Sequence, residues 1–147
     1  MRIVIDTNCL IAALIRDGAA RRILFYSRFS FFSPEFTLDE IDKHISEIIE
    51  KSGIESHELH KLLENLMKRI TIIPQSVYDS WMNKAEEIIG KIDIHDVPFV
   101  AVSLSLPNEG IWSDDSHFTE QKQISVWRTS DLLLYMQSEF SREQKPL

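Results

Sequence analysis

The feature that most constrains this chain is a short apolar run near its start, Ile3-Val4-Ile5, which ends on the carboxylate of Asp6. Three consecutive β-branched residues predict a strand that is buried on both faces, as in a parallel sheet. Ligands of open α/β sheets bind outside the carboxyl ends of the strands, so the pattern puts Asp6 where chemistry usually occurs. The alternative is that Asp6 only caps the apolar helix predicted over 9–15, because Asp is a good N-cap.

Length and composition limit the classes of function. A chain of 147 residues suits one domain, which we expect to span 1–147. The net charge of −7 argues against a general basic nucleic-acid binder. It does not argue against a nucleic-acid enzyme, since metal-binding carboxylates contribute negative charge that bound cations reverse locally.

The single cysteine, Cys9, allows no intramolecular disulfide and no cysteine-rich zinc site, which fits a reducing compartment. Its apolar surroundings favour a buried thiol over a nucleophile. Because the first strand begins near residue 2 and no apolar run approaches membrane-spanning length, we expect no signal peptide and no membrane segment. These observations together predict a cytoplasmic protein.

Strands alternate with helices along the chain, which predicts an α/β fold with a parallel sheet and right-handed crossovers. Ser33-Pro34 has the pattern of a helix start, with serine as N-cap and proline in the first turn. Ser130 is the expected cap of the last helix. The predicted strands are 3–5, 29–33, 70–73, 110–113 and 124–127, and the predicted helices are 9–15, 19–28, 34–53, 56–69, 78–89, 97–106 and 130–140.

Acidic residues stand at the edges of four apolar elements, at Asp6, Glu40, Asp96 and the pair Asp114-Asp115. Strand ends and the following helix starts share one edge of a parallel sheet, so these side chains can converge. Converging carboxylates repel one another unless a cation neutralises them. Oxygen ligands of this kind suit Mg²⁺ or Mn²⁺, which can activate water and stabilise charge on a phosphate.

The ordered set of motifs resembles the PIN domain family over essentially the whole chain. The motifs are Ile-Val-Ile-Asp6-Thr-Asn8, Glu40-Ile41, Asp96-Val-Pro-Phe-Val-Ala-Val and Ser113-Asp114-Asp115-Ser-His-Phe118. The resemblance implies a three-layer α/β/α fold with a small central parallel sheet of four to five strands. It also implies a ribonuclease that uses Mg²⁺ or Mn²⁺ and is often the toxin of a toxin–antitoxin pair, of the VapC-like kind.

The resemblance implies Asp6, Glu40 and Asp96 as the first three acids. The fourth motif of such domains reads Thr-Gly-Asp-x-Asp-Phe, which matches Ser113 to the hydroxyl and Asp115 to the first acid. Two positions depart from that pattern, since Asp114 stands at the glycine and His117 at the second aspartate. Which of Asp114 and Asp115 points into the site therefore stays open.

Each acid also has a structural interpretation. By helical angle, Asp42 and His44 lie nearer the apolar stripe than Glu40 does, so the resemblance decides for Glu40. Asp96 can complement a helix dipole, with Asp93 on the same face, and Asp114 or Asp115 can serve the turn.

Several neighbouring residues are candidates for supporting roles. Thr7, Asn8 and Ser113 are candidate supporting or water-holding groups, although capping is an equal alternative. His95 and His117 neighbour the predicted site and are weaker candidates for phosphate contact, while His57 and His60 fit a solvated helix face. The basic concentration near the predicted site is a candidate for contact with the RNA backbone, with scattered surface arginines as the alternative. It consists of Arg16, Arg21, Arg22 and Arg28.

The first functional hypothesis is an endoribonuclease in which metal-activated water attacks RNA, with 5′-phosphate and 3′-hydroxyl products as the resemblance implies. The second is a catalytically weak PIN-like module that binds RNA or protein, which His117 supports because it replaces an acid. An aspartyl phosphotransferase is disfavoured, since Asn8 stands where a second acid is needed. We expect a homodimer through the aliphatic helices at 35–51 and 56–69, and an antitoxin protein as a further partner.

Overall fold

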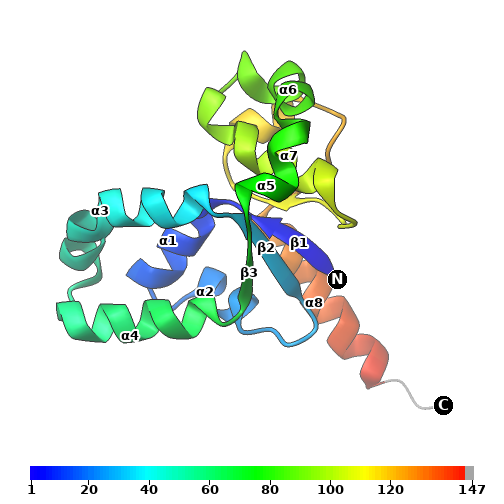
Figure 1. Ribbon diagram of the computed structural model, residues 1–147. Helices are drawn as coiled ribbons and strands as arrows, with labels where there is room; N and C mark the ends of the chain where they lie inside the picture. Colours follow the sequence, from blue (N-terminus) through cyan, green and yellow to red (C-terminus); the bar gives the residue numbers. More distant parts are fainter. Residues whose placement is uncertain (145–147) are drawn as a thin grey trace.

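The computed structural model describes residues 1–144, and a parallel sheet lies at its centre (Figure 1). The strands lie in the order β3-β2-β1-β4-β5, and every neighbouring pair runs parallel. The predicted parallel sheet of four to five strands is thereby confirmed. The strands are β1 (Arg2–Ile5), β2 (Ser30–Pro34), β3 (Ile70–Ile73), β4 (Ile111–Trp112) and β5 (Val126–Trp127).

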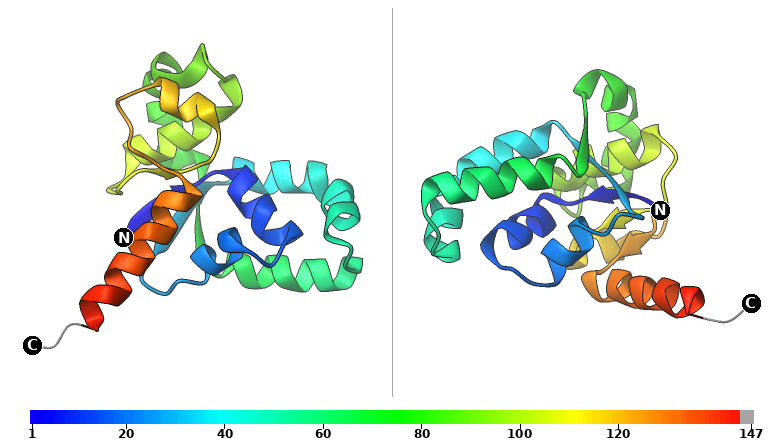
Figure 2. Two further views of the ribbon diagram at one scale, coloured as in Figure 1. Left: turned by 180° about the vertical axis from the view of Figure 1, so that it is seen from behind. Right: turned by 90° about the horizontal axis from the view of Figure 1, so that it is seen from below.

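Helices cover both faces of this sheet, so the predicted three-layer α/β/α architecture is also confirmed (Figures 1 and 2). One face carries α1 (Thr7–Ile15), α2 (Ala19–Leu24), α3 (Phe36–Ser52), α4 (Ser56–Met67) and α8 (Thr129–Glu143). The other face carries α5 (Gln75–Tyr78), α6 (Met82–Ala85) and α7 (Val97–Ser105). Short turns complete the second layer: η1 (Asp79–Trp81), η2 (Glu86–Gly90), η3 (Ile94–Asp96) and η4 (Ser116–Glu120).

Strand alternation divides the interior into two apolar cores. Ile3 and Ile5 of β1 pack on the α1 side, whereas Val4 packs on the α7 side, because successive side chains of a strand point to opposite faces. Trp112 and Ile111 of β4 divide in the same way. Both faces of the central strands are therefore buried, as the unbroken apolar run predicts.

The predicted helix start at Ser33-Pro34 is wrong. Pro34 is the last residue of β2, opposite Ile73, and α3 begins two residues later. Proline has no N–H to donate to a neighbouring strand, and at this end of β2 the N–H of Glu35 donates to the Ile73 carbonyl. The Ser33 hydroxyl does not cap a helix but donates to the carbonyl of Ile5 at 3.2 Å.

The prediction of one continuous α-helix over 78–89 is also wrong. A 3₁₀ turn (η1) and a π-helical turn (η2) flank the single α-helical turn of α6. Tyr78, Ala85 and Ile89 nevertheless lie buried in the second core, as the apolar spacing indicates. The spacing identifies the buried face, while tertiary packing decides the local pitch.

The predicted cap of the last helix, Ser130, is replaced by a contact from a distant turn. Helix α8 begins at Thr129, whose backbone N–H donates to Asp114 Oδ1 at 2.8 Å. Asp131 Oδ2 accepts a further hydrogen bond from the backbone N–H of Arg128.

Within residues 1–144, no helix is long and apolar enough to cross a bilayer.

Candidate metal centre

The candidate site lies at the carboxyl edge of the sheet, where four chain segments meet. Asp6 directly follows β1, and the turn 113–115 directly follows β4, which pairs with β1. Glu40 lies in the first turns of α3, the helix that follows β2. Asp96 ends η3 and precedes α7 on the other face of the sheet. The topology thus brings together acids from both layers of helices.

Asp6 is almost fully buried, with 5% of its surface exposed. Its Oδ2 accepts a hydrogen bond of 2.8 Å from the Ser113 hydroxyl, and its Oδ1 accepts a longer one from the backbone N–H of Asn8. Burial, with smaller contributions from the charges of Asp115 and Glu40, raises the pKa of Asp6 to about 6, although these two hydrogen bonds lower it. Asp6 therefore does cap α1, but it also lies close enough to two other acids to be repelled by them.

Glu40 is positioned by a hydroxyl group on a different helix. Thr7 Oγ1, in the first turn of α1, donates to Glu40 Oε1 at 2.8 Å. Thr7 Oγ1 lies 3.3 Å from the hydroxyl of Thr37, which in turn lies 2.6 Å from the hydroxyl of Ser33. This buried row of hydroxyls joins β2, α1 and α3. It orients the Glu40 carboxylate toward the end of β1.

Asp96 is the most perturbed acid of the group. It is 7% exposed, and burial together with the charges of Asp93, Asp6 and Asp115 raises its pKa to about 7, while His117 lowers it. Its Oδ2 is buried and has no hydrogen-bond partner within residues 1–144. An unpartnered buried carboxylate oxygen is costly unless a cation or a proton compensates it.

The two acids after β4 have different surroundings. Both oxygens of Asp114 accept hydrogen bonds from Thr129, at 2.8 Å from its N–H and 2.6 Å from its hydroxyl. The backbone N–H of Asp115 donates to Ser113 Oγ, and the Asp115 carboxylate accepts from the N–H of His117. The negative charge of Asp115 raises the pKa of both Asp6 and Asp96, so Asp115 lies near both buried acids.

Of the predicted RNA-contacting arginines, Arg16 is the one that lines a cleft beside these acids. The cleft has a volume of about 450 Å³, and its wall includes Asn8 and Asp115. Arg21 donates instead to the carbonyls of Ala13 and Leu14 at the end of α1. Arg22 lines a separate depression, and Arg28 pairs with Glu139 and Glu143 on α8.

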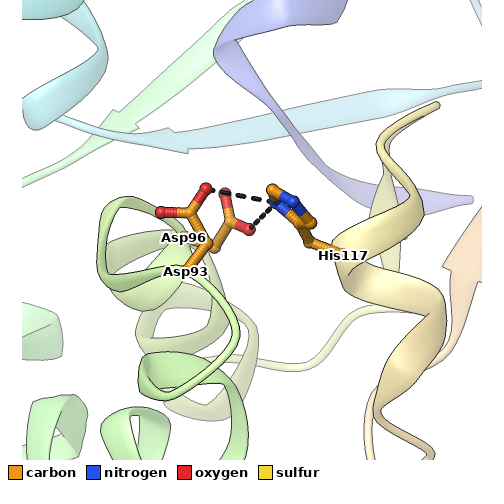
Figure 3. A group of neighbouring side chains, drawn as sticks. All are labelled: Asp93, Asp96 and His117. Carbon is orange, nitrogen blue, oxygen red and sulfur yellow. Dashed lines mark ion pairs between the residues drawn. The ribbon is translucent and has the colours of Figure 1, made fainter.

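Two residues beside the acids were not predicted to contact them. Asp93 was predicted only to share a helix face with Asp96, and His117 was interpreted as the replacement of an acid and as a weaker candidate for phosphate contact. Both lie against Asp96, as Figure 3 shows. The signal available in the sequence was the i,i+3 spacing of Asp93 and Asp96 and the replacement of an acid by His117. The supporting hydroxyls Ser33 and Thr37 carried no signal beyond their i,i+4 spacing.

The donor set fits a hard divalent cation. Buried carboxylates repel one another, two of them have raised pKa values, and one oxygen lacks a partner, all of which a bound cation would relieve. Asp6, Glu40, Asp96 and Asp115 are the residues that would hold it.

Comparison with known proteins adds an independent finding. The PIN domain family matches residues 4–137, from β1 into α8. A comparison with curated proteins gave no match. The matched region contains the acids of the candidate site, and the resemblance carried by the four motifs is confirmed at the level of the family. The chain belongs to the PIN domain family.

Proposed function

We propose that this protein is a metal-dependent endoribonuclease that hydrolyses RNA phosphodiesters with water as the nucleophile. Membership in the PIN domain family supports nuclease-type chemistry. The observation that carries the proposal is the electrostatic coupling of acids from separate segments. The charge of the partly exposed Asp115 raises the pKa of the buried Asp6 and Asp96, and the charge of Asp6 also raises the pKa of Asp96. Such perturbed carboxylates at a sheet edge are typical of functional sites.

In this proposal Asp6, Glu40, Asp96 and Asp115 are the metal ligands. Held by these residues, Mg²⁺ or Mn²⁺ would supply an activated water and positive charge beside the phosphate. Ser113 holds the Asp6 carboxylate, and Thr7 holds Glu40, through the hydrogen bonds described above. The expected products carry 5′-phosphate and 3′-hydroxyl ends.

Asp115 is preferred over Asp114 as the fourth ligand. Both Asp114 oxygens are engaged by Thr129, and using them for a metal would release the start of α8. Asp115 retains an oxygen that accepts no hydrogen bond within residues 1–144. Asp114 is then a turn residue that also caps a helix.

The cleft bordered by Asn8, Arg16 and Asp115 is the proposed path of the RNA. The Arg16 side chain is exposed there and offers a positive charge at the edge of an acidic centre. A phosphate contact at this point would orient the strand without reading its sequence. The net charge of −7 makes such local contacts more important, because the chain as a whole carries the same sign of charge as the RNA backbone.

Purified protein should cleave RNA when Mg²⁺ or Mn²⁺ is present and lose the activity in excess chelator. Mapping the ends of the products tests the water mechanism separately, because a 2′,3′-cyclic phosphate would mean that a ribose hydroxyl is the nucleophile. Absence of cleavage with every divalent ion and several RNAs would favour the alternative, a catalytically weak module that binds RNA or protein.

The proposed partners are an RNA substrate, a second copy of the chain and an antitoxin protein, in the cytoplasm. The homodimer would use the helices α3 and α4, where Leu38 of α3 is 42% exposed. Light scattering at micromolar concentration that gives about 17 kDa, the mass of one chain, would refute the homodimer.

A further inference from the structure

Asp93, Asp96 and His117 form a compact group on the α7 side of the sheet (Figure 3). Asp93 begins η3, Asp96 ends it, and His117 comes from η4, which is distant in sequence. His117 Nδ1 lies 3.2 Å from Asp93 Oδ2 and 3.8 Å from Asp96 Oδ2. It also lies 3.3 Å from Asp115 Oδ1. One imidazole nitrogen therefore faces three carboxylate oxygens.

The facing atoms are not hydrogen-bonded to one another. His117 Nδ1 and Asp96 Oδ2 are both buried atoms without a hydrogen-bond partner in the part of the chain that the structure describes. The Asp96 side chain is nine-tenths buried, so water does not easily reach it. A proton shared between Nδ1 and a carboxylate would satisfy both atoms, but none of these contacts has the directional geometry of such a bond.

The separations match the edges of a metal coordination polyhedron. Ligands bound at about 2.1 Å lie about 3.0 Å apart in an octahedron and about 3.4 Å apart in a tetrahedron. The distances from Nδ1 to Asp93 and Asp115, 3.2 and 3.3 Å, fall in this interval, and the distance to Asp96 is slightly longer. Asp93 Oδ1 accepts the backbone N–H of His95 at 2.9 Å, which holds the carboxylate in place while Oδ2 faces the group.

We propose that Asp93, Asp96 and His117 form a cation site of mixed nitrogen and oxygen ligands that selects a first-row transition metal, such as Co²⁺ or Zn²⁺, over Mg²⁺. Imidazole nitrogen suits these ions, whereas Mg²⁺ prefers oxygen ligands and water. Ligation through Nδ1 puts the imidazole proton on Nε2, and the partly exposed ring allows this nitrogen to meet solvent.

This inference rests on the proposed function in one respect, since Asp96 belongs to both sites. The site adjoins the proposed nuclease centre and differs from it in the imidazole and in Asp93. Its occupancy would give the protein a metal preference that an all-carboxylate centre lacks.

Metal binding by the full chain tests the proposal without measuring cleavage. Calorimetry with Co²⁺ and with Mg²⁺ gives the ratio of the two affinities. His117→Ala should lower the Co²⁺ affinity by at least about tenfold and leave Mg²⁺ binding nearly unchanged. His117→Asp restores an oxygen ligand and should reduce the Co²⁺ preference by a similar factor. His95→Ala is the matched control, because His95 is exposed and contributes only its backbone N–H to Asp93.

Two further measurements keep the result unambiguous. Asp93→Asn retains the oxygen that accepts from His95 but loses the negative charge, so it should also weaken Co²⁺ binding. This variant tests the site independently if a His117 variant fails to fold. In the unaltered protein, Zn²⁺ should move the ¹⁵N resonance of His117 Nδ1 to that of a metal-bound nitrogen, while Nε2 takes the resonance of a protonated nitrogen.

Unchanged Co²⁺ affinity in both His117→Ala and Asp93→Asn would overturn the proposal, as would an Nδ1 resonance insensitive to Zn²⁺. His117 would then be a counter-ion of the acids. Loss of RNA cleavage with every metal would reject the proposed nuclease and leave this binding result standing.

Discussion

Replacing Asp96 by asparagine should stabilise the metal-free protein above neutral pH. The Asp96 carboxylate is buried, has an unpartnered oxygen and is repelled by Asp93, Asp6 and Asp115. Its pKa rises from the ordinary 3.8 to about 7 on folding. At roughly 1.4 kcal/mol for each pKa unit, ionised Asp96 opposes folding by on the order of 4 kcal/mol.

The sign of the pH dependence follows from proton binding. Between about pH 4 and pH 7 the folded protein holds a proton on Asp96 that the unfolded chain has lost, so this group makes stability fall as pH rises through that interval. Above pH 7 the penalty is fully present and constant. Well below pH 4 it disappears, because Asp96 is then protonated in both the folded and the unfolded state.

Asparagine removes the charge but keeps a polar group that must still be buried, so we expect a gain of about 1–3 kcal/mol at pH 8. For a domain of this size that is a rise in Tm of roughly 3–10 °C. The assay is thermal unfolding followed by circular dichroism, with chelator present, at pH 4.5 and pH 8. Glu64→Gln on the exposed face of α4 is a control for the loss of one negative charge.

The reasoning is refuted if Asp96→Asn lowers Tm at pH 8, or raises it equally at both pH values. With a saturating divalent cation, the unaltered protein should have the higher Tm. The cation binds the unaltered site more tightly than the variant and therefore stabilises the unaltered protein more.

Three further predictions concern single residues. Asp115→Asn should reduce turnover by a hundredfold or so with little change in Tm, in line with the loss of one electrostatic contact. Asp114→Asn should mainly lower stability, by roughly 1 kcal/mol, because it weakens the contact with Thr129. The opposite pattern would mean that Asp114 is the ligand and Asp115 the turn residue. Arg16→Ala should raise KM for RNA several-fold and reduce the salt dependence of KM. Arg22 lines a separate depression, so Arg22→Ala should change neither quantity. Equal effects of the two variants would mean that RNA does not follow the cleft beside Arg16. Gly110→Ala should lower the free energy of unfolding by about 2–4 kcal/mol, since Gly110 has φ +132° and a Cβ there would lie 2.4 Å from the carbonyl oxygen of Ser125; an unchanged Tm would contradict this.

Much of the fold could be predicted from the sequence, because apolar periodicity reports burial directly. The unbroken run Ile3-Val4-Ile5 predicted a strand buried on both faces, and β1 is the central strand of the sheet. Residues whose local pattern fits two structures were predicted less well. Ser33-Pro34 has the composition of a helix start, yet its pairing with β3 keeps it in a strand.

The site divides in a similar way. Acids at the ends of apolar elements could be found from the sequence, since topology alone brings them to one edge. The partners of Asp114 and Asp115 could not, because a turn breaks the alternation of side chains and its geometry depends on Thr129, which lies far along the chain. The contact between His117 and Asp93 could not be found for the same reason, since it joins two separate turns.

The measurement that tests the account most directly is the rate of RNA cleavage by Asp6→Asn beside the unaltered protein, with Mn²⁺ present. Asparagine retains the oxygen that accepts from Asn8 and removes a charge that burial already opposes, so the variant should fold. We predict that cleavage falls by roughly 30-fold to 1000-fold, equivalent to about 2–4 kcal/mol, and that chelator abolishes the activity of the unaltered protein. Cleavage by Asp6→Asn at an undiminished rate, persisting in chelator, would contradict the metal centre at the end of β1.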